Sequence, residues 1–311
     1  MTEYRHHCRL MGCAFELIVA DENGEQAQLW LQQGVAEMKR IEQLLTEYDE
    51  GSETSLLNRN AGKEPVKVSH EVYDLLVRCS SIATLTQGAF DISIGPLKKL
   101  YHFKKGDYNL PSRSLLQATL CHVGHEHILL LPDCKVLLRK KGMRISFAAI
   151  GKGYAADKVK QLWVANGVKA GVVNASGDLT VIGTKADSSS WQAGIANPDE
   201  PNSVLLYVPL HDCSIATSGD YEQYFIKDGV RYSHTLNPKT GYPLTGVKSV
   251  SIISHSAELC DALATAVYVM GVEVGLHFVA QLPDVKCIMV DNDNRLVLSK
   301  NIAMQKFTEK A

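Results

Sequence analysis

The order of strand-like and helix-like segments along the chain is the feature that most constrains its fold. Short apolar segments typical of strands occur at 13–20, through 127–147, and repeatedly between 170 and 254. Helix-like segments interrupt them at irregular intervals, without the regular strand–helix–strand repetition that builds a parallel sheet. The sequence therefore predicts an α+β fold with mixed sheets and flanking helices.

Helical spacing of apolar residues marks the segments that flank these strands. Gln26–Leu45 has this spacing over its whole length, and Ser69 is a typical N-cap for a second helix that ends near Leu85. Two further helices are predicted at 151–167 and 260–271, and the second of these is expected to stop at its terminal glycine.

Turn residues divide the rest of the chain. The polar stretch 46–65, rich in Gly, Ser and Asn, is predicted to be a loop. Pro132-Asp133 and Lys141-Gly142 are expected to separate three neighbouring strands. Asp228-Gly229 is the strongest hairpin signal in the chain, and 286–299 is predicted to form a closing hairpin.

Composition narrows the class of protein. The chain has 311 residues, of which 45% are apolar, and this is enough for one large core. No linker or repeat divides it, so we expect one domain over 1–311. Lys and Arg (32) nearly balance Asp and Glu (34), and no basic run suggests nucleic-acid binding. No apolar stretch is long enough to suggest a membrane span.

The N-terminal segment and the cysteines both favour a cytoplasmic protein. Residues 1–20 lack the apolar centre of a signal peptide, although a trimmed exported form stays open as an alternative. The eight cysteines form no CxxC pair, and several lie in apolar runs. We therefore expect buried, reduced thiols rather than disulfides or a zinc site.

Two polar residues stand out in the apolar helix predicted at 260–271. Asp261 and Thr265 are four positions apart, so their side chains lie on one helix face. A carboxylate and a hydroxyl are hard oxygen donors that suit Mg²⁺, which completes its shell with water and substrate phosphates. The alternative is structural: Thr265 bonds back to its own helix, and Asp261 pairs with a nearby basic residue.

Three other stretches are candidate sites. Lys152, between two glycines at a helix start, would suit an anion, although a surface lysine is the simpler interpretation. Thr217, Ser218 and Gly219 form a small polar group, and His234 is expected on a strand beside a Pro/Gly turn. The sequence His125-Glu126-His127 lacks the HExxH spacing of a zinc site, so we favour a solvated strand end.

Taken together, these stretches resemble the ApbE family, the FAD:protein FMN transferases. The resemblance runs from about Met11 to Gly271. It is carried, in order, by MGCAFELIV, TEYDEGSETSLLN, TQGAFDISIGPL, AAIGKGYAADK, VNASGDLTVIG, ATSGDYEQYF, RYSHTLNPKTGYP and CDALATAVYVMG.

The resemblance implies a fold of two interwoven subdomains with the active site between them. It also implies a Mg²⁺ site formed by Asp261, Thr265 and Ala149, the last through its backbone carbonyl. Lys152 would lie near the diphosphate of FAD, and His234 and Asp91 are candidates for the base.

The implied FAD contacts come from five parts of the chain. With the polar pair Thr217 and Ser218, the predicted cofactor site contains Met11, Tyr48, Ala89, Phe90, Asp91, Lys152, Thr217, Ser218, His234, Thr235 and Leu236. Tyr48 is expected to stack on the flavin ring, and in the family a tyrosine here accompanies transfer rather than hydrolysis. Ser146 departs from the family, whose members often have an acidic residue at this position.

The implied reaction is the Mg²⁺-dependent transfer of FMN from FAD to a threonine or serine of a partner flavoprotein, with release of AMP. Two alternatives remain open. One is a pyrophosphatase that splits FAD into FMN and AMP with water, and the other is a flavin-binding protein without turnover.

Overall fold

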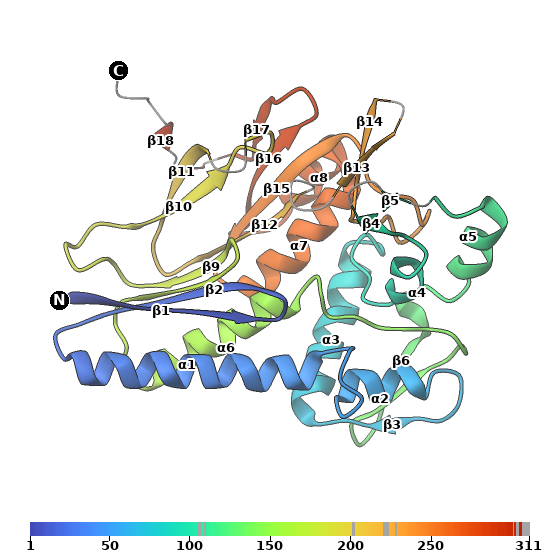
Figure 1. The fold of residues 1–311 in the computed structure, drawn as a ribbon, viewed down its shortest axis with the longest axis horizontal. Helices are drawn as coiled ribbons and strands as arrows, with labels where there is room; N and C mark the ends of the chain where they lie inside the picture. The colour runs from blue at the N-terminus through green and yellow to red at the C-terminus, as the bar shows by residue number, and fades with distance from the viewer. Residues whose placement is uncertain are drawn as a thin grey trace.

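The protein is described by a computed structural model that covers 1–104, 107–108, 110–200, 203–219, 224–227, 229–300, 302 and 305–306. Its largest element is an eight-stranded antiparallel sheet, which confirms the α+β class (Figure 1). In spatial order the strands are β1 (Thr2–Leu10), β2 (Cys13–Asp21), β8 (Gly171–Ala175), β9 (Asp178–Ile182), β12 (Ser214–Gly219), β15 (Val247–Ser254), β16 (Lys286–Asp291) and β17 (Leu296–Leu298).

Helices cover one face of this sheet. They are α1 (Gly24–Leu45), α6 (Gly151–Ala165), α7 (Ala257–Met270) and α8 (Val272–Val279). Alternation along β2 explains the arrangement: Leu17 and Val19 pack under α1 and α6, whereas Ile18 points to the opposite face. The sheet therefore has a core on both sides.

The opposite face is covered by a smaller sheet. It contains β10 (Trp191–Ala196), β11 (Val204–Leu210) and β18 (Gln305–Lys306). Trp191 and Leu206 pack against residues of the large sheet such as Ile18 and Ile253. Because this packing buries the middle of the large sheet on both faces, strands such as β2 and β8 contain nearly continuous apolar runs.

A second region lies beside the large sheet and is built mostly from the chain between 46 and 150. It contains α2 (Glu53–Arg59), α3 (His70–Leu85), α4 (Gly95–Lys98), α5 (Arg113–Leu120), the 3-10 turn η1 (His125–His127), the sheet β3 (Val66–Lys67), β7 (Lys135–Leu138) and β6 (Ile128–Leu131), and the short pair β4 (Phe103–Lys104) and β5 (Asp107–Tyr108). The hairpin β13 (Tyr224–Lys227) and β14 (Val230–Ser233) completes the described elements.

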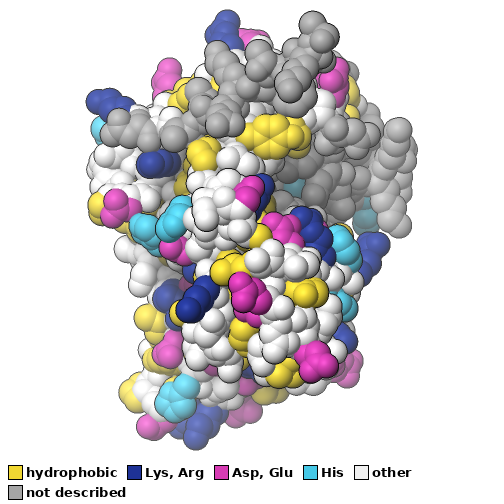
Figure 2. Space-filling model, turned by 90° about the vertical axis from the view of Figure 1, so that its left-hand side faces the viewer, with side chains coloured by type: hydrophobic (Ala, Val, Ile, Leu, Met, Phe, Trp, Pro, Cys, Tyr) yellow, Lys and Arg dark blue, Asp and Glu magenta, His cyan; other side chains and the backbone are white. Residues whose placement is uncertain are grey.

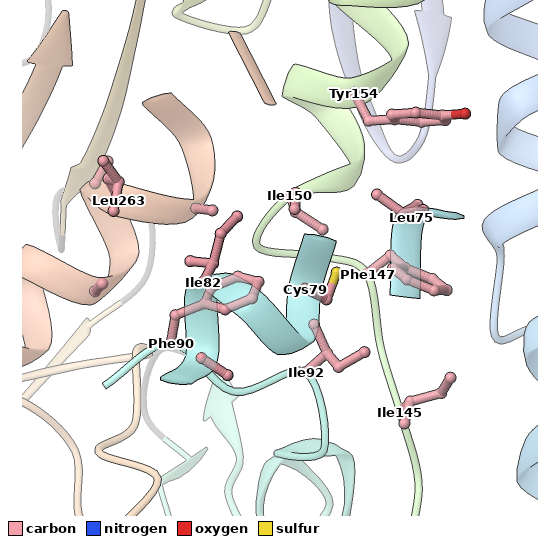
Figure 3. Close-up of a cluster of buried hydrophobic side chains, with 14 of the residues drawn as sticks. Leu75, Cys79, Ile82, Phe90, Ile92, Ile145, Phe147, Ile150, Tyr154 and Leu263 are labelled. Atoms are coloured by element: carbon pink, nitrogen blue, oxygen red, sulfur yellow. The ribbon is translucent and has the colours of Figure 1, made fainter. Parts of the chain in front are cut away.

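The two regions share a core. Phe90, Ile92 and Phe147 from the second region pack in the same buried cluster as Ile150, at the N-terminus of α6, and Leu263 of α7 (Figure 3). This cluster joins α6 and α7 to the second region. It therefore fixes the position of the second region relative to these two helices. The prediction of one domain over 1–311 stays a prediction.

Several sequence signals are confirmed. Ser69 caps α3 by accepting a hydrogen bond from the Val72 N–H, and α7 stops at Gly271, which has φ of 79°. The β13–β14 hairpin forms where it was predicted, and Gly229 of its turn has φ of 75°. Asp228, the other residue of that turn signal, lies outside the described residues.

Other expectations were wrong. Residues 53–59 were predicted to be loop but form α2, because Ser52 caps the helix start and Leu57 is buried in the core. The third strand expected before Phe147 does not form; only an isolated bridge joins Arg144 to Ile94. Strand β1 was not predicted, since its exposed polar residues hide the alternation.

The cysteines, the surface charges and the helices were each the subject of a prediction from the sequence. All eight cysteines are free, as expected. Burial holds for three of them, Cys79, Cys260 and Cys287; four others are half-buried, and the expectation of buried thiols was wrong for the exposed Cys121. Acidic and basic side chains intermingle on the face drawn in Figure 2. Among the described residues, no helix has the length and apolarity that a membrane span requires.

Candidate active site

Helix α7 places Asp261 and Thr265 in the wall of one cavity, as their spacing predicts. The helix starts at the N-cap Ser256, whose hydroxyl accepts a hydrogen bond from the Leu259 N–H. Asp261 is only 5% exposed and Thr265 is half-buried, yet both line a cavity of about 280 Å³. The polar face of an otherwise apolar helix therefore points into a cavity, not into the core.

The rest of this first cavity comes from five other segments of the chain, at 89–98, 148–152, 176, 217–219 and 234–238. Its walls are formed by Ala89, Phe90, Asp91, Ile94, Lys98, Ala148, Ala149, Lys152, Ser176, Thr217, Ser218, Gly219, His234, Thr235, Leu236 and Pro238, in addition to the two residues of α7. Most of the predicted site residues are thus brought together, although they are spread over nearly 180 positions of sequence.

Gly153 lets α6 approach α7. A Cβ atom at this position would lie 2.2 Å from the carbonyl oxygen of Ala257 and 2.9 Å from the Cβ of Asp261. The Gly153 N–H donates a 3.1 Å hydrogen bond to Oδ2 of Asp261. The second glycine of the G-K-G segment therefore serves helix packing and orients the Asp261 carboxylate, a role that its sequence did not reveal.

Lys152 is held by an acidic residue that the sequence analysis missed. Its Nζ donates to Oδ2 of Asp178, which begins β9 and is only 1% exposed, and Oδ1 of Asp178 accepts a 3.1 Å hydrogen bond from the Thr217 N–H. Burial alone would lower the pKa of Lys152, but Asp178 and then Asp261 outweigh it and raise that pKa. Lys152 is therefore a fixed cation.

Asp261 lies beside a second buried acid, Asp178, and this arrangement favours a positive charge next to the Asp261 carboxylate. Burial and, after it, the neighbouring Asp178 raise the pKa of Asp261 to about 7, although Lys152 and the Gly153 N–H act against this rise. Two buried carboxylates thus share one lysine. A divalent cation beside Asp261 would offset the remaining negative charge.

The donor atoms in this wall suit a hard cation. The Asp261 carboxylate and the Thr265 hydroxyl line the cavity with Ala149, which precedes α6 and has a backbone carbonyl oxygen to offer. The Thr265 Oγ1 lies 3.2 Å from Oγ of Ser218. No group of three or more His, Cys, Asp or Glu in the described parts of the chain could hold a metal, so an ion here would depend on hydroxyl, backbone and substrate oxygens.

A second cavity of about 570 Å³ adjoins the first. Tyr48, in the loop after α1, and Met11, in the β1–β2 turn, line it, as does the buried Ser146. Tyr48 is 91% exposed, so its ring is available to a ligand. The two cavities share the lining residues Lys98, Ala148, Lys152 and Ser176.

The triplet 89–91 supports the first cavity from the second region. The ring of Phe90 is 1% exposed and belongs to the shared core, so little of it can touch a ligand. The Asp91 carboxylate accepts hydrogen bonds from the Ser93 N–H and hydroxyl and from the His125 N–H. These contacts favour a structural role for Asp91 over that of the base.

His125 belongs to the same polar group. Its hydrogen bond with Asp91 outweighs burial and raises the pKa of the His125 imidazole. The expectation of a solvated strand end was wrong here, because His125–His127 forms the turn η1 before β6. The residue pair Asp91 and His125 therefore fixes this turn beside the cavity.

The segment after β14 and strand β12 complete the first cavity. His234 follows the strand instead of lying on it, because β14 ends at Ser233. His234 and Thr235 are half-buried, whereas Leu236 is 2% exposed and packs in a small core with Leu97. Leu236 can therefore offer mainly its backbone to a ligand.

Strand β12 presents two hydroxyls near the acids. The Thr217 hydroxyl lies 2.7 Å from Oγ of Ser251 on β15, and Ser218 reaches Thr265 of α7. These contacts tie β12 to its neighbours and leave little freedom to either hydroxyl.

Sequence reasoning missed Asp178, Lys98 and Ser176 as site residues. Asp178 follows the turn at Ser176 and Gly177, which both have positive φ, and such a turn before a buried strand is a readable signal. No comparable signal marks Lys98, which reaches the cavities only because α4 packs beside the turn before α6.

The fold and the site together define a class: an α+β protein with a two-part cleft that combines a helix-borne acid and hydroxyl, a fixed lysine and an exposed tyrosine. The sequence profile of the ApbE family matches residues 11–289. The chain belongs to the ApbE family.

Relatives and solved structures agree with this assignment. The chain is 32% identical to the FAD:protein FMN transferase of Treponema pallidum over 281 residues, covering 85% of this chain and 78% of the relative. A Klebsiella pneumoniae protein with the same name is 32% identical over 84% of this chain and 82% of its own length.

Two crystal structures have the same fold. The ApbE protein of Thermotoga maritima superimposes with a TM-score of 0.89 at 32% identity, over 96% of this chain and 97% of that one. The apo form of the Pseudomonas stutzeri flavinyl transferase ApbE gives a TM-score of 0.86 at 26% identity, over 96% and 95%.

Proposed function

We propose that the protein is a Mg²⁺-dependent FAD:protein FMN transferase. The observation that carries the proposal is the convergence of Asp261, Thr265 and Lys152 on one cavity that continues into a second cavity beside Tyr48. The first cavity offers donors for a cation and a diphosphate, and the second offers an aromatic ring for a flavin. The names of the relatives point the same way.

The residues present fit a magnesium ion. Asp261, Thr265 and the Ala149 carbonyl would hold it, and a bound Mg²⁺ would neutralise the FAD diphosphate. The Gly153 N–H orients the Asp261 carboxyl group and Asp178 fixes Lys152, so both side chains are in place before the substrate arrives. Such preorganised charge is usually the largest contribution to a reaction of this kind.

The chain's own residues would then organise a phosphoryl transfer. A threonine or serine hydroxyl of the acceptor attacks the phosphorus on the FMN side, forming a phosphoester as the bond to the AMP oxygen breaks. His234 is the better-placed group to take the hydroxyl proton, because the Asp91 carboxylate is already occupied by Ser93 and His125. Tyr48 would cover the flavin and limit access of water.

The test combines the two products. The purified chain is incubated with FAD, MgCl₂ and a flavoprotein acceptor that contains a threonine or serine flavinylation site. We expect the acceptor mass to rise by one FMN and AMP to appear in equal amount, and EDTA to stop both. AMP without a mass shift would identify a pyrophosphatase. Bound flavin without AMP would identify a flavin-binding protein.

A further inference from the structure

Two lysines, Lys98 and Lys152, stand where the two cavities meet. Both line the first and the second cavity. Of the described residues that line these cavities, they are the only lysines or arginines. A substrate that extends from one cavity to the other must pass between or beside them.

The two lysines differ in what balances their charge. Lys152 forms an ion pair with Asp178 and is also attracted by Asp261, so its charge is already offset. The side chain of Lys98, the last residue of α4, makes no hydrogen bond or ion pair within the part of the chain that the structure describes. Its positive charge is therefore still available to a ligand.

The acidic residues near Lys98 are engaged elsewhere. Glu47 pairs with Arg144, with Oε2 and the guanidinium nitrogen 3.1 Å apart, and Oε1 of Glu42 accepts a hydrogen bond from the Met11 N–H. Glu47 acts on Lys98 only at longer range. The Lys98 side chain keeps contact with solvent, but the surrounding cavity walls lower the pKa of its ammonium group through partial desolvation.

We infer that Lys98 binds the diphosphate of the dinucleotide substrate at the junction of the two cavities. The inference rests on the proposed function, which puts a dinucleotide across this junction. A diphosphate carries two negative charges, and the wall already contains the buried carboxylates of Asp178 and Asp261. Of the two lysines at this junction, Lys98 is the one whose charge these acids do not offset, so it remains to attract the substrate.

The position of Lys98 fits this role better than that of a structural residue. It is exposed, whereas Leu97 before it is completely buried and anchors the short helix in a small core. Lys99 after it is also exposed but lines neither cavity. Adjacent lysines on the same element thus form a matched pair, one facing the cleft and the other facing away from it.

Equilibrium binding separates charge attraction from catalysis. FAD is titrated into the full chain in EDTA, so that no turnover occurs, and binding is followed by the change in flavin fluorescence. We expect Lys98→Met to raise the Kd for FAD about ten- to hundredfold, as for the loss of one charged hydrogen bond. Lys98→Arg is expected to stay within about threefold of wild type because it keeps the charge.

Two controls sharpen the result. Lys99→Met is expected to bind FAD like wild type. Riboflavin has no phosphate, so its affinity is expected to be the same in wild type and Lys98→Met. Thermal unfolding checks that each variant is folded, and added salt is expected to weaken FAD binding less in Lys98→Met than in wild type.

Each outcome decides the inference. Unchanged FAD affinity in Lys98→Met, an equal loss in Lys99→Met, or an equal loss of riboflavin affinity would overturn it. A wild type that binds FAD through Lys98 but transfers no FMN would leave the inference standing and reject the proposed transferase activity. A wild type that does not bind FAD would reject both.

Discussion

The two cavities differ in how they are built. The first is walled by helices α6 and α7, strand β12 and the turn before β9, and its charged residues Asp91, Lys152 and Asp261 are held by hydrogen bonds or an ion pair, with Lys98 as the exception. The second depends on the β1–β2 turn and the loop after α1, where Tyr48 is almost fully exposed. Charge is thus held on rigid elements, and the aromatic contact is left on a loop.

This difference suggests that the first cavity stabilises charge during the reaction and that the second recognises the flavin ring. Electrostatic stabilisation needs fixed groups, because a charge that must reorganise during the reaction loses most of its effect. Recognition of a flat ring needs only an available aromatic face, which a loop can present. Substitutions in the first cavity should therefore change rate or stability strongly, and those in the second should change the outcome of the reaction mildly.

The largest effect is expected for Asp261→Asn. The amide can still accept the hydrogen bond from the Gly153 N–H, but it removes the charge that would hold the cation. We expect AMP release from FAD at saturating MgCl₂ to fall by about 10²–10³-fold. The measurement is the initial rate of AMP formation.

Asp284→Asn is the control, because Asp284 is exposed and lines neither cavity. Its rate should equal that of wild type. If Asp261→Asn turned over FAD at the wild-type rate, Asp261 would not be a metal ligand. The view that the first cavity holds the groups that set the rate would then be wrong.

The second-largest loss of activity is expected for Asp178→Asn, which removes the ion-pair partner of Lys152 but keeps Lys152 itself. A misplaced cation is expected to slow turnover by about 10²-fold. Breaking a buried ion pair is also expected to cost about 3 kcal/mol of unfolding free energy, near the lower end of the range because Lys152 is 29% exposed. Urea unfolding and initial rates are measured in parallel.

A double-mutant cycle with Lys152→Met tests whether Asp178 acts through Lys152. If it does, the double variant should be about as slow as Lys152→Met alone. Additive losses of rate would mean that Asp178 acts independently, and Lys152 would then not be a charge fixed in advance.

Gly153→Ala tests the rigid wall through packing alone. The new methyl group would meet the Ala257 carbonyl, so α6 and α7 must separate. We expect a loss of about 1–3 kcal/mol of unfolding free energy. Urea unfolding measures it.

Gly151→Ala is the matched control in the same turn of α6. Its methyl group would lie 3.3 Å from the flexible end of Met11, and alanine favours helix over glycine by up to about 1 kcal/mol. Its stability should therefore be unchanged or slightly higher. Equal destabilisation by the two substitutions would show that close helix contact at Gly153 is not the reason for that glycine.

The smallest effect is expected for Tyr48→Asn in the second cavity. Loss of a stacked ring should shift the ratio of FMN transferred to FMN hydrolysed by about two- to tenfold towards hydrolysis. Because Tyr48 is 91% exposed, the unfolding free energy should change by less than about 0.5 kcal/mol. Acceptor mass and free FMN are measured together.

Tyr48→Phe retains the ring and should retain the wild-type ratio. A ratio that is the same in wild type, Tyr48→Asn and Tyr48→Phe would mean that the exposed ring does not contact the flavin. The second cavity would then need another occupant.

The sequence alone determined the elements and much of the site. Hydrophobic periodicity and caps predicted the α+β class and the four longest of the described helices, α1, α3, α6 and α7, because these signals act over a few neighbouring residues. The four-residue spacing placed Asp261 and Thr265 on one face, and the ordered motifs led to the family. The cytoplasmic location and the flavin contacts stay predictions.

Only the tertiary structure decided which charges belong together. Asp178 and Lys152 are 26 positions apart, and Lys98 lies another 54 positions before Lys152, so no local pattern relates the three. Lys152 meets Asp178 because α6 packs against β9, and Lys98 reaches the same cavity because the start of α4 lies against the chain at Arg144. An ion pair depends on distance in space, and long-range packing sets that distance.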